Sequence, residues 1–92
     1  QAVELAQRQR ERGHEGWARL LEAEVAERRA PEDVAAVERA ARQAIEIAEP
    51  AGMRPLLARA CLVLGGALAR AGRQPEAEVY LTRGRTLLES PG

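Results

Sequence analysis

The residues that could carry catalytic or metal chemistry are few and scattered along the chain. There is one histidine, His14, and one cysteine, Cys61, together with a single tyrosine and a single aspartate. No spacing of His and Cys could close a zinc site, and no glycine-rich phosphate loop is present. The sequence therefore predicts no catalytic residue, no metal site and no cofactor, and we do not expect an enzyme.

The remaining polar residues are typical of a helix surface. Glu22 and Glu24, like Glu76 and Glu78, are two residues apart, so on a helix their carboxylates point to different faces and cannot act as a pair. His14 is expected in a solvated turn, and Cys61 is expected to be a small core residue whose pKa is raised by burial. Arginines that follow glutamates by four residues predict helix-surface ion pairs: Glu4 with Arg8, Glu15 with Arg19, Glu24 with Arg28, and Glu38 with Arg42.

The charges are abundant but balanced. Fourteen basic residues, all arginine, accompany fourteen acidic ones, so the formal net charge is zero. This balance provides no sustained field for a polyanion or for lipid headgroups, and we expect neither nucleic acid nor a membrane as a partner. The apolar run around Leu62 is also far shorter than the ~20 residues that a membrane-spanning helix needs.

Cysteine usage and the start of the chain predict its setting. A single cysteine cannot form an internal disulfide, and no charged-then-apolar leader is present, so we expect a cytoplasmic protein. The chain begins at Gln1, without methionine and inside a predicted helix. We therefore expect a piece of a larger protein.

The elements that must position any site are helices. Between the prolines and glycines, apolar residues recur at helical rather than alternating spacing, which predicts an all-α fold without strands. The expected helices cover residues 1–12, 14–29, 31–49, 54–71 and 75–89, with a tail over 90–92. The apolar residues of the first two expected helices are Ala2, Leu5 and Ala6, on one face, and Trp17, Leu20, Leu21 and Val25. In the third helix the residues expected to point inward are Val34, Val37, Ala41, Ala44, Ile45 and Ala48. The fourth has an apolar stripe of Leu57, Cys61, Leu64 and Leu68, and the fifth carries Ala77, Leu81, Leu87 and Leu88.

Glycine and proline predict where these helices begin and end. The first helix is expected to stop near Gly13, and Pro31 suits the first turn of the third, where its missing N–H is no loss. The segment from Pro50 to Gly52 should break the third helix. Gly72 is a left-handed C-terminal cap by its position, and Pro75 opens the last helix.

The sequence also contains an internal echo. Residues 1–7, Gln-Ala-Val-Glu-Leu-Ala-Gln, reappear as residues 43–49, Gln-Ala-Ile-Glu-Ile-Ala-Glu, and residues 83–89 are a degraded third copy. A period of roughly forty residues with two helices per unit is typical of a helical solenoid, in which each hairpin buries its apolar face against the next. The expected units are the second helix of a truncated repeat (1–12), a first hairpin (14–49) and a second hairpin (54–89).

The second hairpin resembles a tetratricopeptide repeat. The signature W-x2-L-G-x2-Y followed by A-x3-F reads here as Cys61-x2-Leu64-Gly65-x2-Leu68 followed by Ala77-x3-Leu81. Gly65 and Ala77 would let two helices approach closely, while Leu68 and Leu81 fill the gap beside them. The resemblance implies a right-handed α-α superhelix of about five helices. In the first hairpin, the same displacement places Glu22 where the signature has a core leucine, so its register stays open.

Two short segments are similar to a subgroup of that family. They are Gly13-His14-Glu15-x-Trp17 and Gly52-Met53-Arg54-Pro55-Leu56, which look like the long-period arrays that follow nucleotide-binding or cyclase domains in large bacterial signalling proteins. The resemblance implies that the first helix of each hairpin lines a concave wall. The wall residues would be Trp17, Leu20, Glu24, Glu27, Arg28, Arg59, Leu62, Gly66, Ala69 and Arg70.

These observations predict a protein-binding scaffold or regulatory module that docks a peptide or a partner domain on its concave wall. Exposed Trp and Arg are frequent binding anchors, and Arg59 or Arg70 could hold a carboxylate bidentately. A free C-terminus is not the expected ligand, because the carboxylate clamps of the family use Lys and Asn and this chain has neither. Two alternatives stay open: self-association through exposed terminal helices, and a small-molecule-sensing regulatory segment.

Overall fold

The structure, a computed structural model, describes residues 2–89, with the exception of the side chains of Ala2 and Ala6. These residues form four helices and no strand: α1 (Ala2–Arg29), α2 (Val34–Ala51), α3 (Arg54–Arg70) and α4 (Gln74–Glu89). The predicted all-α class is confirmed, with one helix fewer than expected. Gln1, the tail over 90–92 and the side chains of Ala2 and Ala6, expected on one apolar face, lie outside the described residues.

The difference in number arises in α1, which runs through Gly13 without a break. The prediction of separate helices over 1–12 and 14–29, with His14 in a turn, is wrong. Helices α2 and α3 each end before a glycine with positive φ, Gly52 at 67° and Gly72 at 79°, whereas Gly13 has no such conformation. When residues 1–7 are aligned with residues 43–49, Arg10 falls at the position of Gly52. Because an arginine disfavours the left-handed conformation that ends a helix, nothing stops α1 there.

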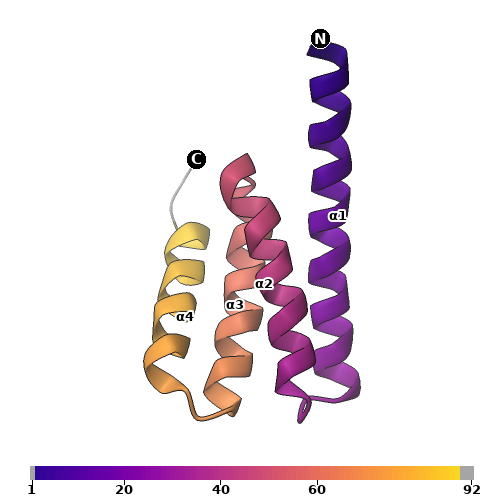
Figure 1. The fold of residues 1–92 in the computed structure, drawn as a ribbon. Coiled ribbons are helices and arrows are strands. Elements are labelled where there is room, and N and C mark those ends of the chain that lie inside the picture. Colours follow the sequence, from indigo (N-terminus) through magenta and orange to yellow (C-terminus); the bar gives the residue numbers. More distant parts are fainter. Residues whose placement is uncertain (1, 90–92) are drawn as a thin grey trace.

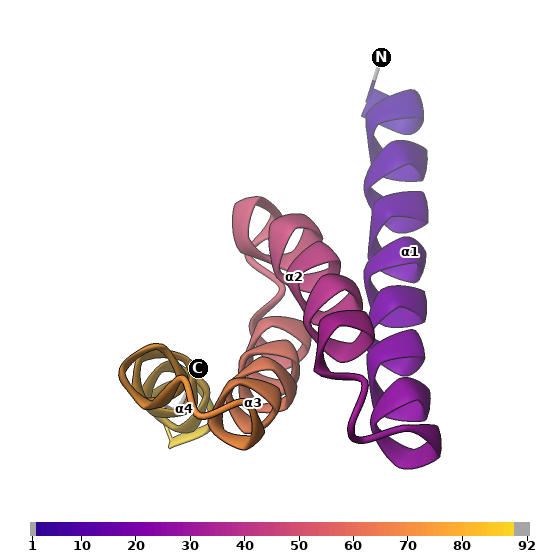
Figure 2. The ribbon, with the colours of Figure 1, turned by 60° about the horizontal axis from the view of Figure 1, so that its bottom comes forward.

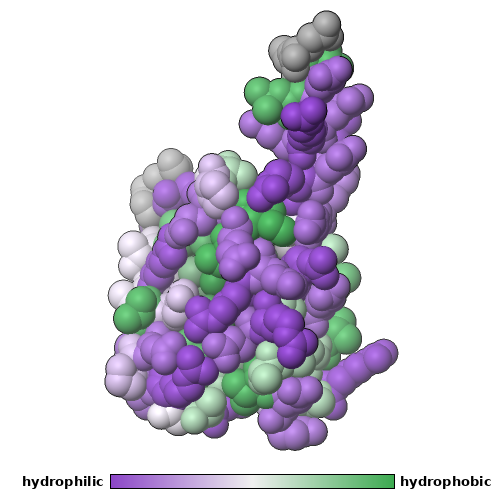
Figure 3. All heavy atoms as spheres, in the orientation of Figure 1, coloured by the Kyte–Doolittle hydropathy of each residue, from purple (hydrophilic) through white to green (hydrophobic). Residues whose placement is uncertain are grey.

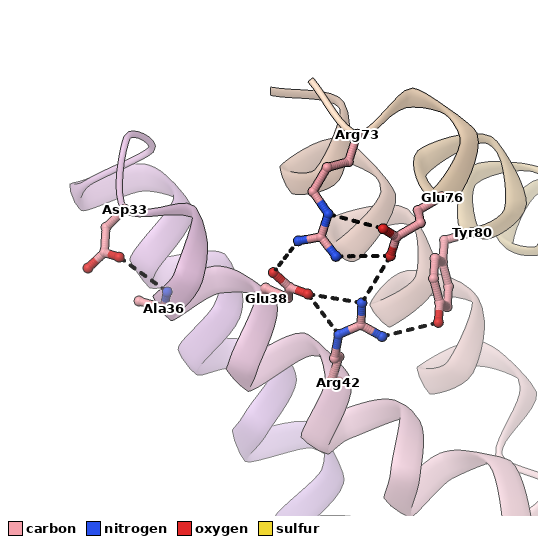
Figure 4. Close-up of polar contacts among 7 residues, drawn as sticks. All are labelled: Asp33, Ala36, Glu38, Arg42, Arg73, Glu76 and Tyr80. Atoms are coloured by element: carbon pink, nitrogen blue, oxygen red, sulfur yellow. Dashed lines mark hydrogen bonds and ion pairs between the residues drawn. The ribbon is translucent and has the colours of Figure 1, made fainter. Parts of the chain in front are cut away.

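The start of α2 is set by Asp33 and not by Pro31. The Asp33 carboxylate accepts a hydrogen bond from the backbone N–H of Ala36 (3.2 Å), and this cap makes Val34 the first helical residue (Figure 4). Pro31 lies in the preceding turn, so the prediction that it opens the helix is wrong.

The end of α2 lies beyond the expected Glu49, because Pro50 is accommodated inside the last turn. The helix closes at Gly52, whose backbone N–H donates to the Glu49 carbonyl (3.3 Å). The N–H of Met53 donates to the Ala48 carbonyl (3.0 Å), which completes a Schellman-type ending.

The predicted ends of the second hairpin are confirmed. Pro55 lies in the first turn of α3, and Pro75 lies in the first turn of α4. Gly72 adopts the left-handed conformation, and the next N–H, that of Arg73, donates to the Leu68 carbonyl (2.9 Å). The same ending therefore closes both α2 and α3.

The core is centred on α3, which packs against all three other helices. The predicted stripe of Leu57, Cys61, Leu64 and Leu68 is buried in full. The large side chains that are removed most completely from solvent are Leu20, Val37, Leu56, Cys61, Leu64 and Leu68. Burial of this apolar area is the main stabilising contribution to the fold.

The predicted close approach of α3 and α4 is also confirmed. A Cβ atom added at Gly65 would lie 2.6 Å from Cγ and 3.1 Å from the backbone N of Leu81, so only glycine fits there without a shift. Ala77 is buried beside them. The small residues thus serve the packing role expected for them.

The helices alternate in direction and form an open row, α1 to α4 (Figures 1 and 2). Helix α1 contacts α2 and α3, α2 contacts α3, and α3 contacts α4, while within residues 2–89 α1 and α4 do not meet. The N-terminal half of α1 extends well beyond the end of α2 (Figure 1). The chain is therefore not a closed bundle over the described part.

The outer helices leave some apolar residues in solvent. Leu5, Leu21, Val25 and Leu88 are exposed, because α1 and α4 are each covered on one side only. Helical spacing predicts that these residues belong to helices, but the core does not cover them. No helix within residues 2–89 is both long and apolar enough to span a membrane.

The register of the first hairpin follows from its turn. Ala30 and Ala71 occupy the same place in the two turns, since each donates to the carbonyl of the residue four positions earlier. Counting back from them pairs Leu20 with Cys61 and Ala23 with Leu64, and all four of these side chains are buried. Glu22 is then an exposed residue bound to Arg19 (3.1 Å) and does not take the place of a core leucine.

Candidate partner-binding surface

Helices α1 and α3 together form a surface that holds an exposed tryptophan. Trp17 is 38% exposed, and the Arg59 guanidinium lies over its ring, 5.6 Å from the ring centroid. Arg59 Nη2 also donates to Glu24 Oε2 at 2.6 Å. Two residues of α1 therefore hold one arginine of α3, by a cation–π contact and by an ion pair.

A second ion pair lies further along the same two helices. Arg70 Nη1 donates to Glu27 Oε2 (3.1 Å), again from α3 to α1. Gly66 lies beneath this pair, since a Cβ atom there would be 3.7 Å from Arg70 Nη1 and 3.9 Å from Glu27 Oε2. Trp17, Glu24, Glu27, Arg59, Gly66 and Arg70 are called the α1/α3 surface below.

The sequence-predicted wall residues divide into two groups. Trp17, Glu24, Arg59 and Arg70 are brought together on the α1/α3 surface, and Arg28 is exposed near the end of α1. Leu20 is not part of a wall: only 1% of it is exposed and it belongs to the core, because it takes the position that Cys61 has in the second hairpin.

Leu62 also differs from the prediction. A Cβ atom added at Gly84 would lie 2.8 Å from Leu62 Cδ2, so this side chain packs between α3 and α4 and is only partly accessible. Ala69 is partly buried against the core. The apolar part of the surface offered to a partner is therefore Trp17.

Known proteins do not supply an identity for this arrangement. No family model, no curated protein and no solved structure matches the chain. The function must be inferred from the geometry of the side chains.

A groove adjoins the tryptophan at the other end of the surface. It has a volume of about 460 Å³ and lies between the N-terminal half of α1 and the turn that joins α2 to α3. Its lining is Gln9, Arg10, Gly13, His14, Trp17, Ala51 and Met53. Sequence reasoning missed this groove, because it exists only if α1 continues straight past Gly13. The signal that was available is the arginine at position 10 in place of the glycine at 52.

A polar network ties α2 to the second hairpin (Figure 4). Glu38 accepts from Arg42 (2.9 Å) and from Arg73 (3.0 Å), and both arginines also contact Glu76. Arg42 donates to the hydroxyl of Tyr80 (3.2 Å). The salt bridge of Arg83 with Glu49 adds a further link between α4 and α2.

The charges of this network affect the pKa of Glu38. Burial alone would raise the pKa of its carboxyl, but hydrogen bonds from Arg42 and Arg73 outweigh burial and lower the pKa below its ordinary value. The network was not predicted beyond the pair of Glu38 with Arg42. Two other expected pairs, Glu15 with Arg19 and Glu24 with Arg28, are replaced. Arg19 binds the nearer Glu22, and Glu24 binds Arg59 of α3.

The remaining chemical groups are placed as follows. Burial raises the pKa of the Cys61 thiol, as expected from its position on the apolar stripe. Among the residues that the structure describes, no three His, Cys, Asp or Glu side chains are grouped so as to hold a metal ion.

Proposed function

We propose that this chain is a protein-interaction module that binds a peptide or a partner domain on the α1/α3 surface. The observation that carries the proposal is Trp17, a large aromatic side chain left 38% exposed and oriented by Arg59. An exposed tryptophan held by an arginine supplies the two residue types most enriched among binding hot spots. Because its neighbours hold it in place, little conformational entropy is lost when a partner covers it.

The charges beside Trp17 favour an acidic partner segment. Arg59 and Arg70 are neutralised only by exposed ion pairs, each of which contributes about 0–1 kcal/mol to stability. A carboxylate of a partner can therefore replace Glu24 or Glu27 at small expense, and a guanidinium can bind it bidentately. The adjoining groove, with Arg10 and His14 in its lining and no carboxylate, extends the same preference.

The wider setting of the proposal is a right-handed tetratricopeptide-like array in a bacterial multidomain signalling protein of the cytoplasm. The open row of antiparallel helices supports it, as do the fit of Gly65 against Leu81 and the identical endings of α2 and α3. In such an array the chain acts as a scaffold or regulatory segment and performs no catalysis itself.

The test selects ligands without assuming a natural partner. A displayed library of random peptides is enriched on the wild-type chain, and the selected peptides are titrated while the fluorescence of Trp17, the one tryptophan present, is followed. We expect enriched peptides to carry Asp or Glu beside apolar residues and to shift the emission. Trp17→Ala, which lacks the fluorophore and is titrated by calorimetry, and Arg59→Ala should each weaken binding by roughly tenfold or more while circular dichroism stays unchanged.

Arg85→Ala is the matched control, because Arg85 is an exposed arginine on α4, away from the proposed surface. Its affinity for the selected peptides should equal that of the wild type. Peptides that bind the Trp17→Ala and Arg59→Ala chains as well as they bind the wild type would show that the α1/α3 surface is not the docking site.

A further inference from the structure

Helix α1 has a second exposed surface, formed by apolar side chains on the side turned away from the other helices. Ala18, Leu21, Val25 and Ala26, together with Glu22, form an open surface to which, within residues 2–89, no other helix contributes. Leu21 is 60% exposed. Apolar side chains reach the surface along this outer edge of α1 (Figure 3). These five residues are called the outer strip below.

The outer strip borders the α1/α3 surface at Leu21 but is centred on another side of the helix. At 100° per residue, Leu21 points almost opposite to Ala23, which is buried against the core, and lies about 40° from Trp17. Ala18 and Val25, at the centre of the strip, point roughly 80–100° away from Trp17. An inference about the strip therefore does not depend on the proposed function.

The charges around the strip form a directional pattern. Glu15 lies one helical turn before Ala18, and Arg28 and Arg29 follow Val25; all three charged residues are exposed. The spacing of 15, 18, 22, 25 and 29 alternates between three and four residues, which keeps these positions on one face of the helix. The face is thus acidic at its N-terminal end and basic at its C-terminal end, with Ala18 and Val25 on either side of Glu22 in the middle.

We propose that the outer strip pairs with the outer strip of a second copy of this chain, with the two α1 helices antiparallel. A twofold axis near Leu21 places Ala18 of one copy against Val25 of the other. It also brings Glu15 of each copy beside Arg28 and Arg29 of its partner copy. Such a contact is self-complementary, as the interface of a symmetric dimer must be. A parallel pair would place like charges together at both ends.

One charged residue lies close to the axis and needs a partner. Glu22 is bound by Arg19 of its own helix (3.1 Å), so its charge is compensated before pairing. The apolar part of the strip is short, and the area it buries is small for a stable complex, so the dimer is expected to be weak.

The test is sedimentation equilibrium of the full chain over concentrations up to about 1 mM, the range in which weak association becomes measurable. We expect a reversible dimer, and Leu21→Glu should raise its dissociation constant by roughly tenfold or more. Leu88→Glu is the matched control, because Leu88 is also 60% exposed but lies on α4. A strict monomer at all concentrations, or equal weakening by Leu88→Glu, overturns the proposal.

The orientation is tested by mixing two charge-reversed chains. Glu15→Arg should weaken the dimer, and so should a chain with both Arg28→Glu and Arg29→Glu, since each places like charges opposite each other in its own homodimer. The two variants mixed together should form a heterodimer at least as tight as the wild type, because every contact of residue 15 with residues 28 and 29 is again between opposite charges. A mixture that associates no better than its components overturns the antiparallel arrangement.

Discussion

Helices α1 and α3 take equivalent places in the two hairpins but differ in length and in cover. α3 has 17 residues, follows the left-handed Gly52, ends just before Gly72 and packs against every other helix. α1 has 28 residues, runs past Gly13 and has neighbours on one side only. Similar apolar patterns therefore give helices of different length, because a glycine in the left-handed conformation ends α3 and no such glycine interrupts α1 at Gly13.

The difference in cover also explains where exposed groups gather. Trp17 and Leu21 are both exposed on α1, whereas Ala58 and Leu62, which take their places on α3, lie against Gly84 of α4. Both surfaces proposed for binding lie on α1 for this reason. Paired substitutions, one in α1 and one in another part of the chain, test whether this difference in cover determines stability and binding.

The largest effect is expected from a charge in the core of α3. Leu64→Asp buries an unpaired carboxylate where the wild-type side chain is fully buried, which destabilises by about 4 kcal/mol or more and should unfold a chain of this size. Leu21→Asp places the same charge on the exposed side of α1 and should leave the helical circular dichroism unchanged. Equal loss of signal in both variants would contradict the difference in cover.

A smaller effect is expected from filling the contacts of two buried glycines. Gly65→Ala forces Leu81 away at its Cγ and its backbone N, and should lower the free energy of unfolding by about 1–3 kcal/mol. The atoms nearest to a Cβ at Gly16 of α1 belong to side chains, and the closest, Leu56 Cδ2 at 2.6 Å, is the end of a flexible one. Gly16→Ala should therefore destabilise less than Gly65→Ala in urea denaturation, and the reverse order would argue against tight packing of α3 on α4.

Gly13 in α1 and Gly52 after α2 should respond to alanine with opposite signs. Gly52→Ala puts a side chain at φ 67° with no atom within 4 Å of the new Cβ, so the loss of about 1–2 kcal/mol is conformational alone. Gly13→Ala replaces a helical glycine and makes an ordinary contact with Met53, so it should raise the free energy of unfolding by about 0.5–1 kcal/mol. Thermal melts of both variants measure this, and destabilisation by Gly13→Ala would indicate a break in α1.

Much of the second hairpin could be predicted from the sequence because its signals are local. The stripe from Leu57 to Leu68 has helical spacing, and Pro55, Gly72 and Pro75 act on the backbone beside them. The first hairpin was harder, since an echo of apolar residues over 1–7 predicts a helix but not its end. The length of α1 depends on Arg10, which disfavours the left-handed conformation that Gly52 adopts at the end of α2.

The candidate surface could be predicted in part. Exposure of Trp17 and the position of Arg59 follow from helix periodicity once two hairpins are placed side by side. That Glu24 and Glu27 would bind arginines of α3 could not be predicted, because residues 35 and 43 positions apart meet only through the packing of α1 on α3. The inward position of Leu20 likewise depended on a register that the turn at Ala30 sets.

The smallest effect concerns the polar network that holds α2 to the second hairpin. The pKa of Glu38 is lowered in the folded chain, so its charge stabilises the fold above its ordinary pKa of 4.5, and this contribution is lost as the pH falls below that value. Glu38→Gln should therefore lower the free energy of unfolding near neutral pH by up to about 1 kcal/mol, and by less at pH values where the wild-type carboxyl is protonated. Urea denaturation across this range measures the difference between the two chains, with Glu78→Gln, an exposed residue of α4, as the control. A difference for Glu38→Gln that does not change with pH would mean that the ionised carboxylate contributes nothing beyond its hydrogen bonds.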